Sequence, residues 1–102
     1  MWDNRSVLSE FYDWVEFTLA NGQTNYDVAL NQTSLFSNIK VARNIVIDTN
    51  INITARFSRV NLPSVKIDAV QSPVEFKGLI SVRNIFLTNA SGSDATVRIM
   101  LA

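Results

Sequence analysis

The stretch of sequence that decides the fold is INITARFS, residues 51–58. Its apolar side chains fall at positions 51, 53, 55 and 57, and polar side chains stand between them. Because successive side chains of a β-strand point to opposite faces, this alternation predicts a strand with one buried and one exposed face. Similar patterns lie on both sides of this stretch, so we expect strands rather than helices to form the core.

The neighbouring segments extend this pattern along the chain. Residues 43–49 are rich in β-branched side chains, and Asp48, Thr49 and Asn50 offer turn chemistry between them and the next strand. We therefore expect residues 43–49 and 51–58 to form a tight hairpin. Further strands are expected at residues 65–69, 74–77, 79–88 and 95–101.

The first third of the chain is less regular. Residues 15–19 alternate, and Asn21-Gly22 is a strong hairpin signal, so residues 26–30 are expected to pair with them. Residues 33–37 are compatible with one short helical turn. Residues 6–14 fit either a short helix capped by Ser6 or an extended arm. We therefore expect an N-terminal arm or short helix at residues 1–13 and a separate β-domain at residues 14–102.

Strands at such regular spacing, separated by turn residues, predict the fold class. We expect an all-β protein with a single antiparallel β-sandwich of about eight strands. A jelly roll or a related Greek key fits that number. A chain of 102 residues fits one domain of this kind.

Two segments of the chain also repeat in outline. RNIVI at residues 43–47 is similar to RNIFL at residues 83–87, and TARF at 54–57 is similar to TVRI at 96–99. Either the domain has two related halves, or two β-segments simply look alike. Both interpretations place the same side chains in the core: Ile45, Ile47, Ile53, Phe57, Ile85, Leu87, Val97 and Ile99.

Composition narrows the classes of function. Charged residues make up 18% of the chain, against about 25% in a typical soluble domain. Asn, Ser and Thr take their place, and such a surface is cheaper to bury against a partner than a charged one. The same residues also suit a protein that is simply rich in strands and turns. A net charge of zero argues against nucleic acid, and no apolar run is long enough to cross a membrane.

Residues that could carry catalysis are scarce. The chain has no Cys and no His, which removes thiolate nucleophiles, imidazole bases and the usual zinc ligands. We therefore expect no enzymatic activity, no cofactor and no metal. A calcium site at Asp48, Asn50 or Asp94 is the alternative, although turn residues of this type usually bond their own backbone. Outward-facing Arg56 and Arg98 fit either a basic stripe or cross-strand ion pairs.

Aromatic side chains are concentrated near the N-terminus, where four of the ten lie within fourteen residues. Because aromatic residues are enriched at binding hot spots, this segment is a candidate contact surface. It would dock into a neighbouring subunit or fold back over its own sandwich. Apolar residues in outward phase, such as Val46, also suggest that one sheet face is covered. The predicted partner-binding residues are Trp2, Phe11, Tyr12, Trp14, Phe86 and Met100.

Five segments carry a resemblance to known proteins: NYDV at 25–28, LFSN at 35–38, RNIVIDT at 43–49, and the closing VRNIFLTN at 82–89 with ASGSDATVRI at 90–99. They resemble segments of small β-sandwich structural proteins of tailed-phage virions. The resemblance covers residues 14–102. It implies a protein of the decoration, head-fibre or tail-associated type.

The most specific function implied by this resemblance is a bacteriophage capsid decoration or cement subunit. Such a subunit binds capsid protein and stabilises the shell. We expect a homo-oligomer, with a trimer favoured, that contacts capsid or other virion proteins. It would be made in the host cytoplasm and located in the virion. The alternatives are a tail or neck adaptor subunit and a carbohydrate-binding β-sandwich module, which would need aligned solvent-facing aromatics.

Overall fold

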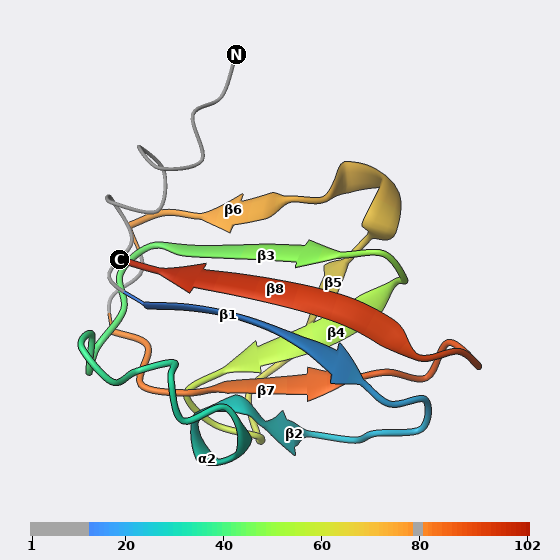
Figure 1. Cartoon of the computed structure of the whole chain (residues 1–102), viewed down its shortest axis with the longest axis horizontal. Coiled ribbons are helices and arrows are strands. Elements are labelled where there is room, and N and C mark those ends of the chain that lie inside the picture. The colour runs from blue at the N-terminus through green and yellow to red at the C-terminus, as the bar shows by residue number, and fades with distance from the viewer. Residues whose placement is uncertain (1–12, 79–80) are drawn as a thin grey trace.

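The computed structural model describes residues 13–78 and 81–102, and they form two antiparallel four-stranded sheets packed face to face (Figure 1). Sheet A has the strand order β1-β8-β3-β6, and sheet B has the order β2-β7-β4-β5. The strands are β1 (Asp13–Leu19), β2 (Tyr26–Asp27), β3 (Ile45–Thr49), β4 (Ile53–Phe57), β5 (Val65–Ile67), β6 (Val74–Phe76), β7 (Ile85–Thr88) and β8 (Ala95–Leu101). The predicted all-β sandwich is therefore confirmed.

The chain crosses between the sheets at nearly every step. Only β4 and β5 are neighbours both in sequence and in a sheet, and all other consecutive strands lie in opposite sheets. Two interleaved four-stranded sheets of this kind have the strand order of a jelly roll. Both predicted hairpins are consequently wrong, because β1 and β2 do not pair, and neither do β3 and β4.

The residues expected to close those hairpins join different loops instead. The Asn50 side chain accepts a hydrogen bond from the backbone N–H of Thr96 at 2.8 Å. The backbone N–H of Asn21 donates to Asp94, and that of Gly22 donates to the carbonyl of Asn89. Turn residues therefore predict correctly where the chain changes direction. Packing between the two sheets decides whether the next strand joins the same sheet or the opposite one.

The segment after β2 also differs from expectation. Strand β2 ends at Asp27, whose carboxylate caps the short helix α2 (Val28–Asn31) by accepting from the N–H of Leu30 at 3.0 Å. Helix formation therefore replaces the strand predicted for residues 26–30. Residues 33–37 form turns rather than a helix, with Leu35 and Phe36 buried beneath them.

The second half follows the predicted strands with shorter bounds. A 3-10 helix, η1 (Ala69–Gln71), connects β5 to β6. The predicted strand at 79–88 is reduced to β7 and an isolated bridge between Ala42 and Val82, and residues 79–80 lie outside the described part. The last strand, β8, has the predicted bounds.

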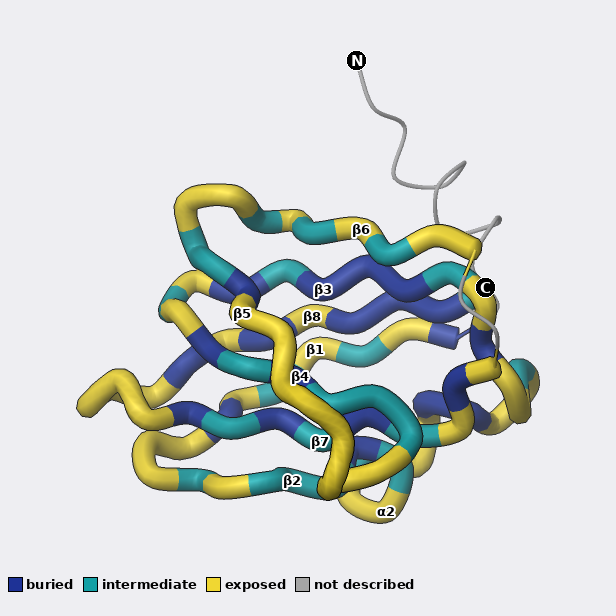
Figure 2. The backbone as a smooth tube through the Cα atoms, turned by 180° about the vertical axis from the view of Figure 1, so that it is seen from behind, coloured by how far each residue is buried: buried dark blue, intermediate teal, exposed yellow. Residues whose placement is uncertain are grey.

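The core lies between the sheets, where the buried segments of both layers face each other (Figure 2). Strand β8 is central, and its inward side chains Ala95, Val97, Ile99 and Leu101 are inaccessible. Aromatic pairs join the sheets along both sides. Phe17 stacks on Tyr26 at 5.5 Å between ring centroids, and Phe57 meets Phe76 edge-on at 5.1 Å. Such pairs add stability beyond the apolar area that they bury.

The repeated segments occupy corresponding places. Strand β3 pairs with β8 in sheet A, while β7 pairs with β4 in sheet B. The first repeated unit therefore runs from sheet A (β3) to sheet B (β4), and the second runs from sheet B (β7) to sheet A (β8). Seven of the eight side chains predicted for the core lie in one buried cluster, and Phe57 is half-buried and packs against it; the seven are Ile45, Ile47, Ile53, Ile85, Leu87, Val97 and Ile99.

Candidate interaction face

The outer face of sheet A carries an apolar row that crosses its strands. Trp14 of β1 lies opposite Met100 of β8, which lies opposite Val46 of β3. Glu75 of β6 continues the same line at the sheet edge. All of these residues alternate with inward-facing core positions, so their side chains point away from the core. We call Trp14, Met100 and Val46 the apolar row.

Exposure varies sharply within this row. The Trp14 side chain is 48% exposed, whereas Met100 is 4% exposed and Val46 is 6% exposed. Large amphipathic aromatics that are half exposed are common anchors of protein interfaces. The row lies at the end of the sandwich where β1 begins and β8 ends, close to the C-terminus (Figure 1).

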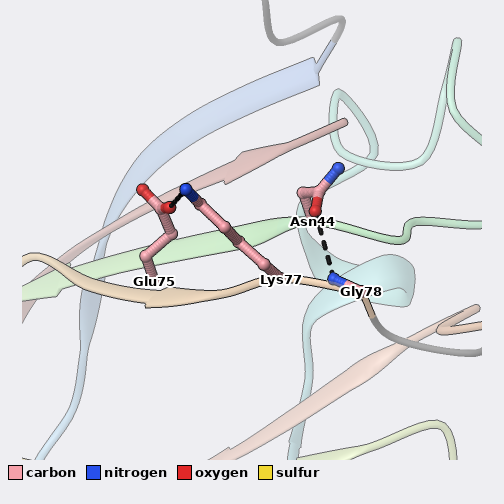
Figure 3. A network of polar contacts seen from close by, with 4 residues as sticks. All are labelled: Asn44, Glu75, Lys77 and Gly78. Carbon is pink, nitrogen blue, oxygen red and sulfur yellow. Dashed lines mark hydrogen bonds and ion pairs between the residues drawn. The ribbon is translucent and has the colours of Figure 1, made fainter.

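Polar residues border the apolar row on two sides. Along β6, the Lys77 ammonium is 2.8 Å from the Glu75 carboxylate, and the N–H of Gly78 donates to the Asn44 side chain at 3.3 Å (Figure 3). In the next row, Arg98 Nη2 lies 3.1 Å from Glu16 Oε1. Both ion pairs are well exposed and therefore stabilise the fold little. An apolar centre with a polar rim is the usual arrangement of a protein interface.

The start of β1 is anchored by a buried carboxylate. Asp13 is 3% exposed and accepts hydrogen bonds from the backbone N–H groups of Asn38 and Ile39, at 3.0 and 2.8 Å, and from the side chains of Ser37 and Asn38. Burial acts to raise the pKa of Asp13, but these hydrogen bonds outweigh it and hold the pKa below its ordinary value. The carboxylate thus fastens β1 to the 37–39 loop.

The structure separates the predicted partner-binding residues. Trp14 and Met100 are direct neighbours on the outer face of sheet A. Phe86 lies on the outer face of sheet B, half-buried between Asp27 and Arg56. The two groups are on opposite sides of the sandwich and do not form one surface. The other three predicted residues, Trp2, Phe11 and Tyr12, lie outside the described residues.

The outer face of sheet B is held together by its own polar contacts. Arg56 donates to the Asn25 side chain at 2.7 Å and to the carbonyl of Leu62 at 2.9 Å. Asn84 donates to Asp27 at 2.8 Å. A shallow groove of about 460 Å³ is also lined by residues of sheet B, and six of its eight lining residues are polar: Asn52, Thr54, Lys66, Asp68, Thr88 and Ser91. None of the residues lining this groove is aromatic.

The two arginines do not form a common basic stripe. Arg98 pairs with Glu16 on sheet A, while Arg56 bonds to polar groups on sheet B. Arg98 therefore forms the cross-strand ion pair that was one of the two expectations. Arg56 instead holds two loops, through Asn25 and Leu62.

Two of the three residues of the calcium alternative already accept hydrogen bonds from the backbone. Asp94 accepts from the N–H of Asn21, and Asn50 accepts from the N–H of Thr96. Among residues 13–78 and 81–102, no three acidic, His or Cys side chains gather as a metal site would require. In the same part of the chain, no helix has the length and apolar character to cross a bilayer.

Sequence reasoning missed part of this face and a second apolar surface. The alternating pattern predicted that Val46 points away from the core, but the sequence did not indicate that it lies beside Met100. Val60 and Leu62 are exposed in the β4–β5 connection and Val65 at the start of β5, and they were not identified as a surface from the sequence. The Asp13 anchor was also missed, because its donors lie about 25 residues away in sequence.

Comparisons with known proteins add no relative. No protein-family model matches the chain, and no curated protein matches it significantly.

Proposed function

We propose that this protein is a non-enzymatic structural subunit of a bacteriophage virion, of the capsid decoration or cement type. Its role is to bind capsid protein and stabilise the shell, as a homo-oligomer in which a trimer is favoured. The observation that supports this proposal most is the apolar row, with a half-exposed Trp14 at one end and a polar rim around it.

The architecture agrees with this role. Jelly rolls build many viral capsid domains, although the same fold also carries lectins. The sandwich is small and low in charge, and the outer face of sheet A carries a half-exposed Trp14 near exposed polar side chains. An exposed aromatic side chain with a polar border suits contact with another protein surface, such as a capsid lattice or a neighbouring subunit.

The carbohydrate-binding alternative has less support. Sugar-binding sandwiches need aromatic side chains that offer their faces to solvent along one sheet or loop set. The polar groove on sheet B has hydroxyl, amide and charged groups but no lining aromatic. The exposed Trp14 lies on the opposite face of the sandwich.

Particle purification tests the proposal. Virions of the phage that encodes this chain are purified by density gradient, and an antibody against the chain is used for immunoelectron microscopy. We expect regular labelling of the capsid surface and a copy number that scales with the capsid protein. Labelling confined to the tail or neck would support the adaptor alternative. Absence of the chain from particles would contradict a virion role.

A further inference from the structure

Strand β1 forms one edge of sheet A and is longer than the other edge strands (Figure 1). It has seven residues, whereas β6, at the opposite edge of the same sheet, has three. The edge strands of sheet B, β2 and β5, have two and three residues. A long edge strand is a template for pairing with another chain, and most proteins keep such edges short or protect them with Pro, Lys or a bulge.

No such protection is present along β1. The strand pairs with β8 residue by residue from Asp13 to Leu19, without a bulge. It contains no Pro, Gly or Lys, and Glu16 is its only exposed charged residue, because Asp13 is buried. By contrast, Pro73 precedes β6, and Lys66 lies in the middle of β5. Among the described strands, β1 is therefore the edge that is most open to strand pairing.

The hydrogen bonds of β8 show which groups of β1 face the open edge. Strand β8 lies between β1 and β3. Both the N–H and the C=O of Thr96 bond to Asn50, which follows β3. Successive residues of a strand direct these groups to opposite sides, so the residues that bond to β1 are the alternate ones, Val97 and Ile99 among them.

Alternate residues of β1 are consequently left with unpaired backbone groups. Phe17 and Val15 lie opposite Val97 and Ile99 and exchange hydrogen bonds with them. The next residues in the alternation direct their N–H and C=O groups away from β8, and these groups have no hydrogen-bond partner among residues 13–78 and 81–102. They belong to Trp14, Glu16 and Thr18, all of which are exposed. The edge thus presents donors and acceptors at the spacing that an added strand requires.

The inner side of this edge is apolar. Val15 and Phe17 are half-buried and pack against the core cluster, and the Phe17 ring stacks on Tyr26 of β2. A strand added beside β1 would place every second side chain next to Val15 and Phe17. Apolar side chains at these positions would remove apolar area from water on both partners. The inner side therefore favours a segment with apolar residues at alternate positions.

The outer side of the edge favours a basic residue. Glu16 contacts Arg98 through one carboxylate oxygen, Oε1, and its side chain is still 48% exposed. If two copies of β1 paired antiparallel through all three open residues, Glu16 would lie opposite Glu16, and like charges directly opposite each other are destabilising. Strand β8 has the complementary pattern, with Arg98 opposite Glu16 and apolar Val97 and Ile99 on either side of it. Charge therefore favours a different chain over a second copy.

We propose that the open edge of β1 binds an extended segment of another protein by strand addition. The segment has apolar residues opposite Val15 and Phe17 and a basic residue opposite Glu16. Backbone hydrogen bonds supply the affinity of such a contact, and the side chains at these three positions supply its specificity. Trp14 lies on the outer face of the same strand and extends the contact surface. This inference does not depend on a virion role.

A peptide that copies β8 tests the inference. The probe has the sequence KATVRIMLK, which is residues 95–101 between two added lysines for solubility. Amide hydrogen exchange of the full chain is followed residue by residue by NMR. We expect the peptide to slow exchange at Trp14, Glu16 and Thr18 by at least about tenfold, because their N–H groups gain acceptors. Exchange at Val15 and Phe17 should change little, because these N–H groups already bond to β8.

A charge exchange tests the predicted register. A second peptide, KATVEIMLK, carries Glu in place of Arg, and the variant Glu16→Lys carries the opposite change in the protein. We expect the natural chain to bind the Arg peptide about threefold more tightly than the Glu peptide, and Glu16→Lys to show the reverse preference.

A backbone variant tests the open N–H groups themselves. Thr18→Pro removes one of them and leaves the bonds between β1 and β8 in place, as Pro does on an edge strand. Thr18→Val keeps the N–H and is the matched control. We expect the Arg peptide to bind Thr18→Val and not Thr18→Pro, and equal binding by the two would contradict strand addition. If exchange at Ile99 shows that Thr18→Pro is unfolded, the charge exchange decides.

Three further outcomes would overturn the inference. Unchanged exchange at Trp14, Glu16 and Thr18 with the Arg peptide at about 1 mM would mean that the edge does not add a strand. Protection of these amides that rises with the concentration of the chain alone would assign the edge to a second copy. The same peptide preference in Glu16→Lys as in the natural chain would show that the basic residue does not lie opposite Glu16.

Discussion

The two outer faces of the sandwich differ in how their side chains are held. On sheet B, Arg56 and Asn84 are tied by hydrogen bonds to Asn25 and Asp27, and Phe86 lies half-buried among them. On sheet A, the corresponding centre is apolar, and the polar side chains form exposed ion pairs at its border. These polar side chains on sheet B therefore bond to neighbouring groups of the same face. On sheet A, by contrast, Trp14 is half exposed and can pack against a partner.

Because the two faces differ, apolar residues that point away from the core have different surroundings on each sheet. Phe86 and Met100 look alike in the sequence, since each interrupts the polar side of an alternating strand. In the structure, Phe86 is half-buried between Asp27 and Arg56, while Met100 belongs to a row that runs across three strands. Met100 and Val46 are nearly inaccessible, so Trp14 is the residue of this row that is exposed for contact.

The largest expected effect concerns the anchor at the edge of sheet A. Replacing Asp13 by Ala leaves the buried N–H groups of Asn38 and Ile39 without their acceptor. We expect the free energy of unfolding to fall by about 3 kcal/mol, because hydrogen bonds to a charged group are strong and buried donors are costly to leave unpaired. Urea unfolding measures the loss. Asp48→Ala, in outward phase on the same sheet, is the matched control and should change stability by less than about 0.5 kcal/mol.

The same carboxylate predicts an acid sensitivity. Its pKa in the folded state lies below the ordinary value of 3.8, so the unfolded chain takes up a proton first as the pH falls. Its stabilising contribution is complete at neutral pH, begins to fall near pH 4, and is lost once the pH passes below the lowered pKa. Urea unfolding across this range should show a steeper loss in the natural chain than in Asp13→Ala. Parallel curves for the two proteins would contradict this role.

The next effect separates the two apolar residues in outward phase. Met100→Ala removes a side chain that is almost fully buried, and we expect a loss of about 2 kcal/mol, at the low end for a buried Met. Phe86→Ala removes a half-buried ring from sheet B and should cost less. Thermal unfolding of both variants compares the faces directly. A larger loss for Phe86→Ala would show that the apolar row is not packed as described.

The smallest effect concerns the two outward arginines. Arg56 uses two different nitrogens to hold Asn25 and the carbonyl of Leu62, and a Lys side chain cannot reproduce this fork. We expect Arg56→Lys to cost about 1 kcal/mol. Arg98→Lys keeps a charge beside Glu16 in an exposed pair and should be neutral within about 0.3 kcal/mol. Equal losses would mean that the polar contacts of sheet B are no firmer than those of sheet A.

Much of the fold could be predicted from the sequence because alternation is a local signal. Residues 53–57 and 95–101 have the expected inward faces, and every side chain predicted for the core is in the core cluster except Phe57, which is half-buried against it. Strand pairing was missed, since Asn21-Gly22 and Asn50 describe a turn without saying which sheet the chain enters next. Pairing in a jelly roll is decided by contacts between residues far apart in the chain.

The candidate site was predictable only in part. The outward phases of Trp14 and Met100 follow from alternation, but their adjacency depends on the pairing of β1 with β8, more than 80 residues apart in sequence. Phe86 was grouped with them because sequence cannot distinguish one outer face from the other. The Asp13 anchor was missed for a similar reason, because an isolated Asp before a strand gives no sign of its donors.

Solution mass measured by light scattering tests most directly whether sheet A carries assembly. The natural chain is compared with Trp14→Ser on sheet A and with Phe86→Ser on sheet B, over a range of concentrations. We predict a closed oligomer, with a trimer favoured, for the natural chain and for Phe86→Ser, and a monomer for Trp14→Ser. A monomeric natural chain at every concentration, or an oligomer that Phe86→Ser dissociates and Trp14→Ser leaves intact, would contradict the account.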